Sequence, residues 1–104
     1  KDMYICGGFN VYPAEVEAAI ESHPSVRSAV VIGLPDDDLG QRVHAIVDLP
    51  ASPGDRVDEQ ELRAHVSTLL VRYKVPRTFE FVSIPLRDDA GKVRRSALRS
   101  ERMT

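Results

Sequence analysis

Two short glycine-containing stretches, far apart in the chain, have residue types that could take part in chemistry. In Gly7-Gly8-Phe9-Asn10, the adjacent glycines can adopt positive φ angles and carry no side chain, so a ligand or another chain can come close to the backbone. Asn10 also tolerates left-handed geometry. By itself this stretch is most simply a turn. The second stretch, Ala90-Gly91-Lys92-Val93, places a lysine directly after a glycine and favours a functional interpretation of both.

The chain also contains acidic residues and histidines that could bind a metal ion, but their spacing does not fit a metal site. The run Asp36-Asp37-Asp38 lacks the alternating ligand spacing of a calcium loop, so we interpret it as a solvated turn. The histidines His23, His44 and His65 have no zinc-like spacing with each other or with Cys6. We therefore predict no metal site and expect the histidines to be structural or exposed.

Four arginines near the C-terminus could bind phosphates, although such a run is more simply a solvated face: Arg94, Arg95, Arg99 and Arg102. The whole chain carries 14 Lys and Arg against 16 Asp and Glu, a net charge of -2. This balance argues against a dedicated nucleic-acid binder. A non-catalytic α+β module that binds an anionic partner stays open as an alternative function.

Length and composition indicate one domain with a modest core, since the chain has 104 residues. No apolar run approaches the length of a transmembrane helix, and no signal peptide is visible. The single cysteine, Cys6, cannot form an internal disulfide and is expected to be a buried packing residue. A reducing compartment fits this, and we expect a cytoplasmic protein.

The hydrophobic periodicity predicts an α+β fold. We expect a small mixed or antiparallel sheet of about three main strands and a short N-terminal hairpin, packed with two main helices and a short C-terminal helix. The predicted strands cover residues 3–6, 26–34, 41–49 and 78–82. The predicted helices cover residues 13–22, a segment that begins after the cap Asp58 and ends at Lys74-Val75-Pro76, and residues 94–102.

The same pattern assigns faces to these elements. The run Ala29-Val30-Val31-Ile32 is apolar on both faces, which predicts a central strand. In the first helix, three glutamates are expected to face solvent: Glu15, Glu17 and Glu21. The second helix is expected to bury a stripe of five residues: Leu62, Val66, Leu69, Leu70 and Tyr73. In the last helix, Ala97 and Leu98 are expected to face the core.

Successive motifs along the chain resemble the small C-terminal domain of the adenylate-forming enzymes. This superfamily comprises acyl-CoA synthetases, adenylation domains of peptide synthetases and beetle luciferases. The motifs are Lys1-Asp2-Met3 with residues 7–17, His23-Pro24-Ser25-Val26, residues 29–36, Tyr73-Lys74-Val75-Pro76 and Gly91-Lys92-Val93. The chain is most similar to a fatty-acyl-CoA ligase, with a peptide-synthetase adenylation domain as the alternative and luciferase as a remote third.

The resemblance implies a two-step ligase that uses ATP and CoA as substrates, with magnesium bound mainly outside this domain. A carboxylic acid, which we expect to be a fatty acid, is first adenylated and then transferred to a thiol. Residues 1–104 are expected to be the mobile C-terminal domain, with the large N-terminal domain as its partner and the hinge residue upstream of Lys1-Asp2. The isolated domain is expected to be inactive.

The resemblance also implies roles for individual residues. Lys92 matches the lysine that catalyses adenylation, and Gly91 lets its loop extend into the cleft. Ala90 stands where the family usually has Ser or Thr, so a hydroxyl contact is absent there.

For the second step, the resemblance implies that Gly7-Gly8-Phe9 lines the tunnel for the pantetheine arm of CoA, with Gly8 as the main contact. Asn10 and Glu15 are expected to support the hairpin and the helix that follows it.

Overall fold

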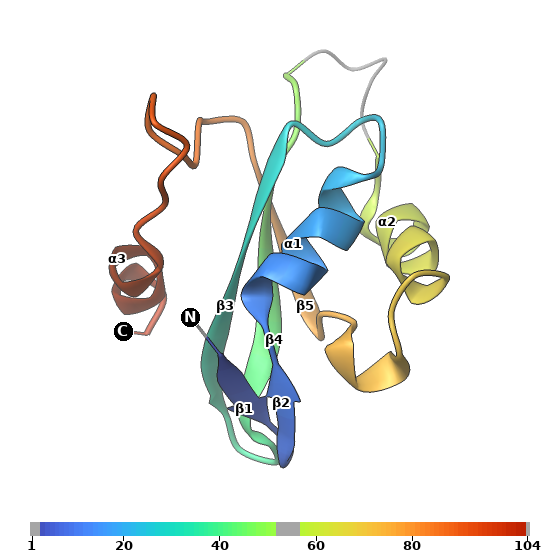
Figure 1. Cartoon of the computed structure of the whole chain (residues 1–104), viewed down its shortest axis with the longest axis vertical. Coiled ribbons are helices and arrows are strands. Elements are labelled where there is room, and N and C mark those ends of the chain that lie inside the picture. Colours follow the sequence, from blue (N-terminus) through green and yellow to red (C-terminus); the bar gives the residue numbers. More distant parts are fainter. Residues whose placement is uncertain (1–2, 52–56, 104) are drawn as a thin grey trace.

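The computed structural model describes residues 3–51 and 57–103 of the chain (Figure 1). In chain order, the elements are β1 (Tyr4–Cys6), β2 (Phe9–Val11), α1 (Pro13–Glu21), β3 (Ser28–Asp36), β4 (Gly40–Asp48), α2 (Glu59–Ser67), the 3₁₀ turn η2 (Arg72–Lys74), β5 (Thr78–Val82) and α3 (Arg95–Glu101). The predicted α+β class is confirmed, with a three-stranded sheet and a separate two-stranded hairpin.

The main sheet has the strand order β3-β4-β5. Strands β3 and β4 pair antiparallel around the acidic turn, while β4 and β5 pair in parallel, with α2 in the connection between them. The sheet is therefore mixed. The prediction that the strand over residues 26–34 is central is wrong, because β4 is the central strand and β3 lies at an edge.

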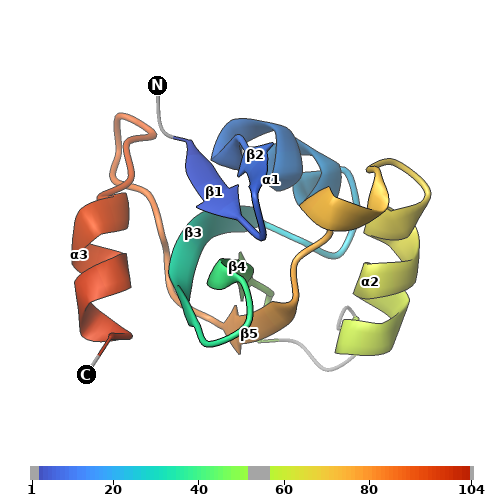
Figure 2. The ribbon, with the colours of Figure 1, turned by 90° about the horizontal axis from the view of Figure 1, so that it is seen from below.

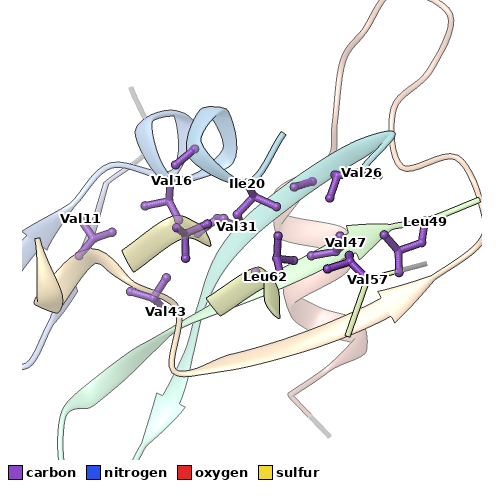
Figure 3. Close-up of a cluster of buried hydrophobic side chains, with 14 of the residues drawn as sticks. Val11, Val16, Ile20, Val26, Val31, Val43, Val47, Leu49, Val57 and Leu62 are labelled. Carbon is purple, nitrogen blue, oxygen red and sulfur yellow. The ribbon is translucent and has the colours of Figure 1, made fainter. Parts of the chain in front are cut away.

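Both faces of the sheet are covered, which explains the apolar pattern of β3. Figure 2 shows the sheet between α3 on one side and α1 with α2 on the other. On the α1 and α2 side, buried aliphatic side chains from helices and strands meet in one cluster that includes Val16, Ile20, Val31, Val47 and Leu62 (Figure 3). On the other side, a second cluster is formed by Val30, Ile32, Leu34 and Ile46 under Leu86, Val93 and Leu98.

The outer edge of β3 is hydrogen-bonded by side chains instead of by another strand. The main-chain N–H of Val31 donates to Glu17 at 2.9 Å, and that of Ala29 donates to Glu21 at 2.9 Å. The prediction that Glu17 faces solvent is wrong, because this residue is only 3% exposed. Its carboxylate is buried because it replaces the hydrogen bonds that a neighbouring strand would make.

Arginines complete the same edge by donating to its carbonyl groups. Arg87 donates to the Ala29 carbonyl at 3.2 Å, and Arg99 donates to the Gly33 carbonyl at 2.7 Å. Four side-chain hydrogen bonds thus pair main-chain groups along the edge of an apolar strand that no other strand covers.

The second helix begins as predicted but ends early. Asp58 caps α2 by accepting a hydrogen bond from the main-chain N–H three residues later at 2.8 Å. The helix ends at Ser67, where the hydroxyls of Ser67 and Thr68 bond to carbonyls of the preceding turn and compete with helix continuation. Leu69 and Tyr73 therefore leave the predicted buried stripe and are 54% and 41% exposed.

The C-terminal helix packs by a narrower face than predicted. Leu98 contacts the buried cluster on its side of the sheet, as expected. Ala97 is exposed, so its predicted inward position is wrong. Hydrogen bonds from the arginines in and next to the helix hold it to the rest of the domain.

Candidate functional site

The Gly7-Gly8 hairpin is a tight two-residue turn between β1 and β2. Cys6 pairs with Phe9 across the hairpin, and the two glycines have φ angles of 60° and 85°. Positive φ at both turn positions matches the right-handed twist of the strands and favours glycine. Asn10 lies in β2 opposite Ile5, so the two glycines alone supply the left-handed geometry of this turn.

The two glycines differ in what surrounds them. The main-chain N–H of Gly7 donates to the Leu39 carbonyl at 2.9 Å, and a Cβ at Gly7 would lie 2.9 Å from a methyl carbon of Leu39. A Cβ at Gly8 would meet no described atom within 4 Å. Gly7 is thus packed against the β3–β4 turn, whereas the face of Gly8 is open to an approaching molecule.

The 3₁₀ turn η2 contacts both the hairpin and the helix α1 that follows it. Phe9 stacks on Tyr73 with ring centroids 4.4 Å apart and an interplanar angle of 22°. The next residue, Lys74, forms an ion pair with Glu15 at 2.8 Å, and this hydrogen bond raises the pKa of Lys74. The spacing of Tyr73 predicts a place in a buried helix stripe, so its stack on Phe9 was not predicted. The one feature of the sequence that pointed to this segment was the place of Tyr73-Lys74 among the family motifs.

A groove with a volume of about 840 Å³ lies beside the hairpin. Its walls include Cys6, Gly7, Phe9, Leu39, Val43, Leu70, Tyr73, Val75 and Pro76, and its cations are Arg63, Arg72 and Arg77. Burial raises the pKa of the Cys6 thiol, so this cysteine stays a neutral packing residue.

Two of the groove's three arginines are free to meet a ligand. Arg63 donates to the Pro76 carbonyl at 2.7 Å and to Glu59 at 2.9 Å. The guanidinium groups of Arg72 and Arg77 donate no hydrogen bond to any residue within 3–51 and 57–103. Apolar walls with two uncommitted cations suit an organic ligand that carries phosphate or another anionic group.

The second candidate site is the turn over residues 88–92. The Asp88 carboxylate accepts hydrogen bonds from the main-chain N–H groups of Ala90 and Lys92, both at 2.9 Å. The main-chain N–H of Asp88 in turn donates to the Lys92 carbonyl at 2.9 Å, and Gly91 has a φ of 78°. The turn is therefore closed on itself and holds the main chain of Lys92 in one place.

The Lys92 ammonium group itself is uncommitted. Lys92 is exposed, and its side chain contacts no acceptor among the described parts of the chain. Lys74, by comparison, has its charge bound by Glu15. Lys92 therefore presents a compact positive charge to solvent from a turn with a fixed main chain.

The two candidate sites lie toward opposite ends of the molecule. Figure 1 shows the hairpin near one end of the long axis and the turn that precedes α3 near the other. The structure therefore does not bring Lys92 together with Gly7, Gly8 and Phe9. A single ligand bound within this domain would not contact both.

The C-terminal arginines form internal contacts instead of an anion-binding face. Arg95 donates to Glu17 at 2.7 Å, Arg99 to the Gly33 carbonyl, and Arg102 to both oxygens of Glu80 at 2.7 and 2.8 Å. The Arg102 guanidinium lowers the pKa of Glu80 to about 2, even though partial burial opposes this change. Of the four arginines, three are thus engaged, and the alternative of an arginine-based anion-binding module loses its basis.

The histidines have structural partners. His44 is buried and bonds to the Thr78 hydroxyl at 2.6 Å and to Glu80 at 3.0 Å, and burial lowers its pKa. His23 bonds to Glu61 at 3.2 Å, and His65 bonds to a serine hydroxyl at 2.8 Å. Within the described residues, no three His, Cys, Asp or Glu side chains come together in a way that could hold a metal ion.

Known proteins similar to this chain identify its family. The sequence pattern described as "AMP-binding enzyme C-terminal domain" matches residues 15–92. The chain belongs to this family. The resemblance inferred from the motifs is thereby confirmed, and proteins similar to this chain include acyl-CoA ligases.

Individual relatives of this AMP-binding enzyme C-terminal domain are ligases. A methyl-dioxo-octahydroindenyl-propanoyl:CoA ligase of Mycobacterium tuberculosis is 48% identical over 99 residues, which are 95% of this chain and 19% of that protein. A fatty acid–acyl-carrier-protein ligase of Streptomyces coeruleorubidus is 40% identical over 95% of this chain and 19% of its own length. The chain thus spans about a fifth of these relatives.

A solved structure of a related enzyme has the same fold over almost the whole of this chain. A Mycobacterium tuberculosis fatty acyl CoA synthetase superposes with a TM-score of 0.86 and 40% identity, over 97% of this chain and 20% of that one.

In the part of the chain that the structure describes, no helix is both long and apolar enough to cross a membrane.

Proposed function

We propose that this chain is the mobile C-terminal domain of an AMP-forming acyl-CoA ligase, in which Lys92 serves adenylation and the Gly7-Gly8 hairpin serves thioester formation. The observation that carries this proposal is the pair of differently built, exposed sites toward opposite ends of one small domain. A domain that rotates against a large N-terminal partner can present one such site in each step.

In the adenylation step, a carboxylate oxygen attacks the α-phosphorus of ATP, a new O–P bond forms and the bond to pyrophosphate breaks. Negative charge increases on the α-phosphate as this happens. An uncommitted ammonium group at that position stabilises the transition state, and Lys92 supplies one. Since the described residues offer no set of three metal ligands, we expect the magnesium that accompanies ATP to be bound outside this domain.

In the thioester step, the thiol of CoA loses its proton and its sulfur attacks the acyl carbonyl carbon of the adenylate. A C–S bond forms, and the C–O bond to AMP breaks so that AMP leaves. The thiol must reach the adenylate along the narrow pantetheine arm. Gly8 offers a stretch of backbone with no side chain and open space before it, so the arm can pass close to it. Phe9 extends the same wall, and its stack on Tyr73 fixes the position of its ring.

The groove beside the hairpin favours CoA as the thiol. The free guanidinium groups of Arg72 and Arg77 suit the phosphates of CoA, and the apolar walls suit its organic part. A relative whose name specifies an acyl-carrier protein makes a carrier thiol the alternative acceptor. For the acid we propose a fatty acid. It would be bound by the large N-terminal domain, and the whole reaction requires both domains.

The proposal is tested with the full-length ligase that contains this chain. We expect Lys92→Ala to lower acid-dependent ATP–pyrophosphate exchange about 100-fold or more, because one preorganised cation at the transition state is lost. Thioester formation from supplied acyl-adenylate should stay within about threefold of wild type, since only the first step uses this charge. Arg94→Ala is the matched control, because Arg94 is a nearby exposed cation to which the proposal gives no role.

Equal loss of both half-reactions in Lys92→Ala would contradict the division of labour. The isolated domain should catalyse no pyrophosphate exchange. Exchange by residues 1–104 alone would contradict the requirement for a large partner domain.

A further inference from the structure

The turn that carries Lys92 lies between two arginines that bind one buried carboxylate. The Glu17 side chain on α1 is 4% exposed. One of its oxygens accepts hydrogen bonds from Arg87, before the turn, at 3.2 Å and from Arg95, after the turn, at 2.7 Å. Its other oxygen accepts the main-chain N–H of Val31 at 2.9 Å. Both ends of the Lys92 segment are thus held at one point of the core.

Arg87 also contacts the Lys92 turn directly. One of its terminal nitrogens donates to the Gly91 carbonyl at 3.3 Å, and the other donates to the Ala29 carbonyl of β3 at 3.2 Å as well as to Glu17. The guanidinium group therefore joins three parts of the domain: the helix α1, the edge strand β3 and the residue before Lys92. A planar fork of several donors suits three acceptors placed in this way.

The turn has few other means of fixing its direction. The hydrogen bonds of Asp88 close the turn internally but do not orient it relative to the sheet. Within the described residues, the hydrogen bond from Arg87 to Gly91 is the one that links the turn to the carboxylate of α1 and the edge of β3. A loss of that bond would leave the turn closed but would remove its hydrogen bond to the guanidinium group, so that only the packing of Leu86 and Val93 and the Arg95–Glu17 pair would hold the ends of the segment.

We propose that Arg87, fixed by the buried carboxylate of Glu17, is a positioning residue that aims Lys92 during adenylation. The inference rests on the proposed function of Lys92. Arg87 does not contact the reacting atoms. It acts by orienting the Gly91–Lys92 backbone, so its removal should impair the step that uses Lys92 and spare the step that uses the hairpin at the other end of the domain.

The test compares Arg87→Met, Arg87→Lys and Arg27→Met in the full-length ligase. Arg27 is a matched control, because it also links a buried carboxylate, Asp48 at 2.6 Å, to a main-chain carbonyl, and it bonds to no described residue of the segment 84–95. Each variant is assayed for kcat and KM for ATP in adenylation, and for thioester formation from supplied acyl-adenylate.

We expect Arg87→Met to lower the kcat of adenylation about tenfold or more, because a small misplacement of a catalytic group has a large effect on rate. The KM for ATP and the thioester half-reaction should stay within about twofold of wild type. The kcat of adenylation in Arg87→Lys should lie between those of wild type and Arg87→Met, since an ammonium group replaces part of the guanidinium fork. Arg27→Met should retain both half-reactions.

Hydrogen exchange gives a second readout of the same variants. In Arg87→Met, the protected main-chain N–H groups of Ala90 and Lys92 should exchange no more than slightly faster, because Asp88 still binds them. Normal adenylation in Arg87→Met, alongside its loss in Lys92→Ala, would overturn the inference and leave the proposed function intact. Equal loss of both half-reactions in Arg87→Met would also overturn it. Normal adenylation in Lys92→Ala would instead overturn the proposed function and the inference with it.

Discussion

The Gly7-Gly8 hairpin and the Lys92 turn both present a tight main-chain turn to solvent, but they are held in place by different forces. The hairpin is held by strand pairing, by one main-chain bond to Leu39 and by an aromatic stack. The Lys92 turn is held by charged side chains that meet at the buried Glu17. The site proposed to admit a ligand arm is thus built from backbone, and the site proposed to aim a charge is held by ion pairs.

Helix α1 connects the two regions through two glutamates. Glu15 binds Lys74 on the hairpin side, and Glu17 binds Arg87 and Arg95 on the lysine side. Residues two apart on a helix point in directions about 200° apart, so one helix can serve both regions. The difference in burial is large, since the Glu15 side chain is 48% exposed and that of Glu17 is 4% exposed.

The same substitution at these two positions should therefore have very different effects. We expect Glu17→Gln to reduce the free energy of unfolding by about 3 kcal/mol, because it leaves two guanidinium groups beside a buried neutral amide. Glu15→Gln should produce a much smaller change, because its ion pair is exposed and screened by solvent. Urea unfolding of the 104-residue chain measures both. Equal destabilisation would contradict the contrast between the two regions.

The two hairpin glycines should separate stability from function. Gly7→Ala combines positive-φ strain with a collision against Leu39 and should reduce the free energy of unfolding by about 2 kcal/mol. Gly8→Ala introduces only the positive-φ strain and should reduce the free energy of unfolding by about 1 kcal/mol. In the full-length ligase, Gly8→Ala should slow thioester formation about tenfold by narrowing the path of the pantetheine arm. Normal thioester formation in this variant would remove Gly8 from the proposed tunnel.

Acid should loosen the attachment of α3 to the sheet, as the smallest of these effects. The pKa of Glu80 is about 2 against an ordinary value of 4.5, so its contribution to stability is present above pH 4.5 and is lost as the pH falls toward 2. Burial lowers the pKa of His44 below 6.5, so protonation of the unfolded chain adds to the loss below that pH. Both effects act where Arg102 joins α3 to the sheet.

Glu80→Gln tests this pH dependence. The variant should be less stable than wild type at pH 7 and should lose less stability between pH 4.5 and pH 2, because one of the two titrating groups is gone. Urea unfolding at a series of pH values measures the difference. Parallel curves for the two proteins would show that the Glu80–Arg102 pair does not contribute to acid sensitivity.

Much of the fold could be predicted because local patterns determine it. The β-branched runs of β3 and β4, the cap Asp58 and the Gly-Gly turn each act within a few residues of chain. The end of α2 could not be predicted in the same way, since Leu69 and Tyr73 have the spacing of a buried stripe while the hydroxyls of Ser67 and Thr68 favour ending the helix.

The edge position of β3 and the burial of Glu17 were missed for one shared reason. A strand that is apolar on both faces is usually flanked by other strands, and a glutamate on a helix is usually solvated. Here the partners of Glu17 come from Arg87 and Arg95, far along the chain, and no local pattern indicates that pairing. The motifs predict Lys92 and Gly8 as site residues, but the contacts that hold their turns could not be predicted from them.

The most direct test of two separate sites is to measure both half-reactions in Lys92→Ala and Gly8→Ala forms of the full-length ligase. The ratio of the adenylation rate to the thioester rate is compared between the two variants. We predict that this ratio falls in Lys92→Ala and rises in Gly8→Ala, so that the two variants differ by about a thousandfold. Ratios that change in the same direction, or that stay at the wild-type value in both variants, would contradict the assignment of one site to each step.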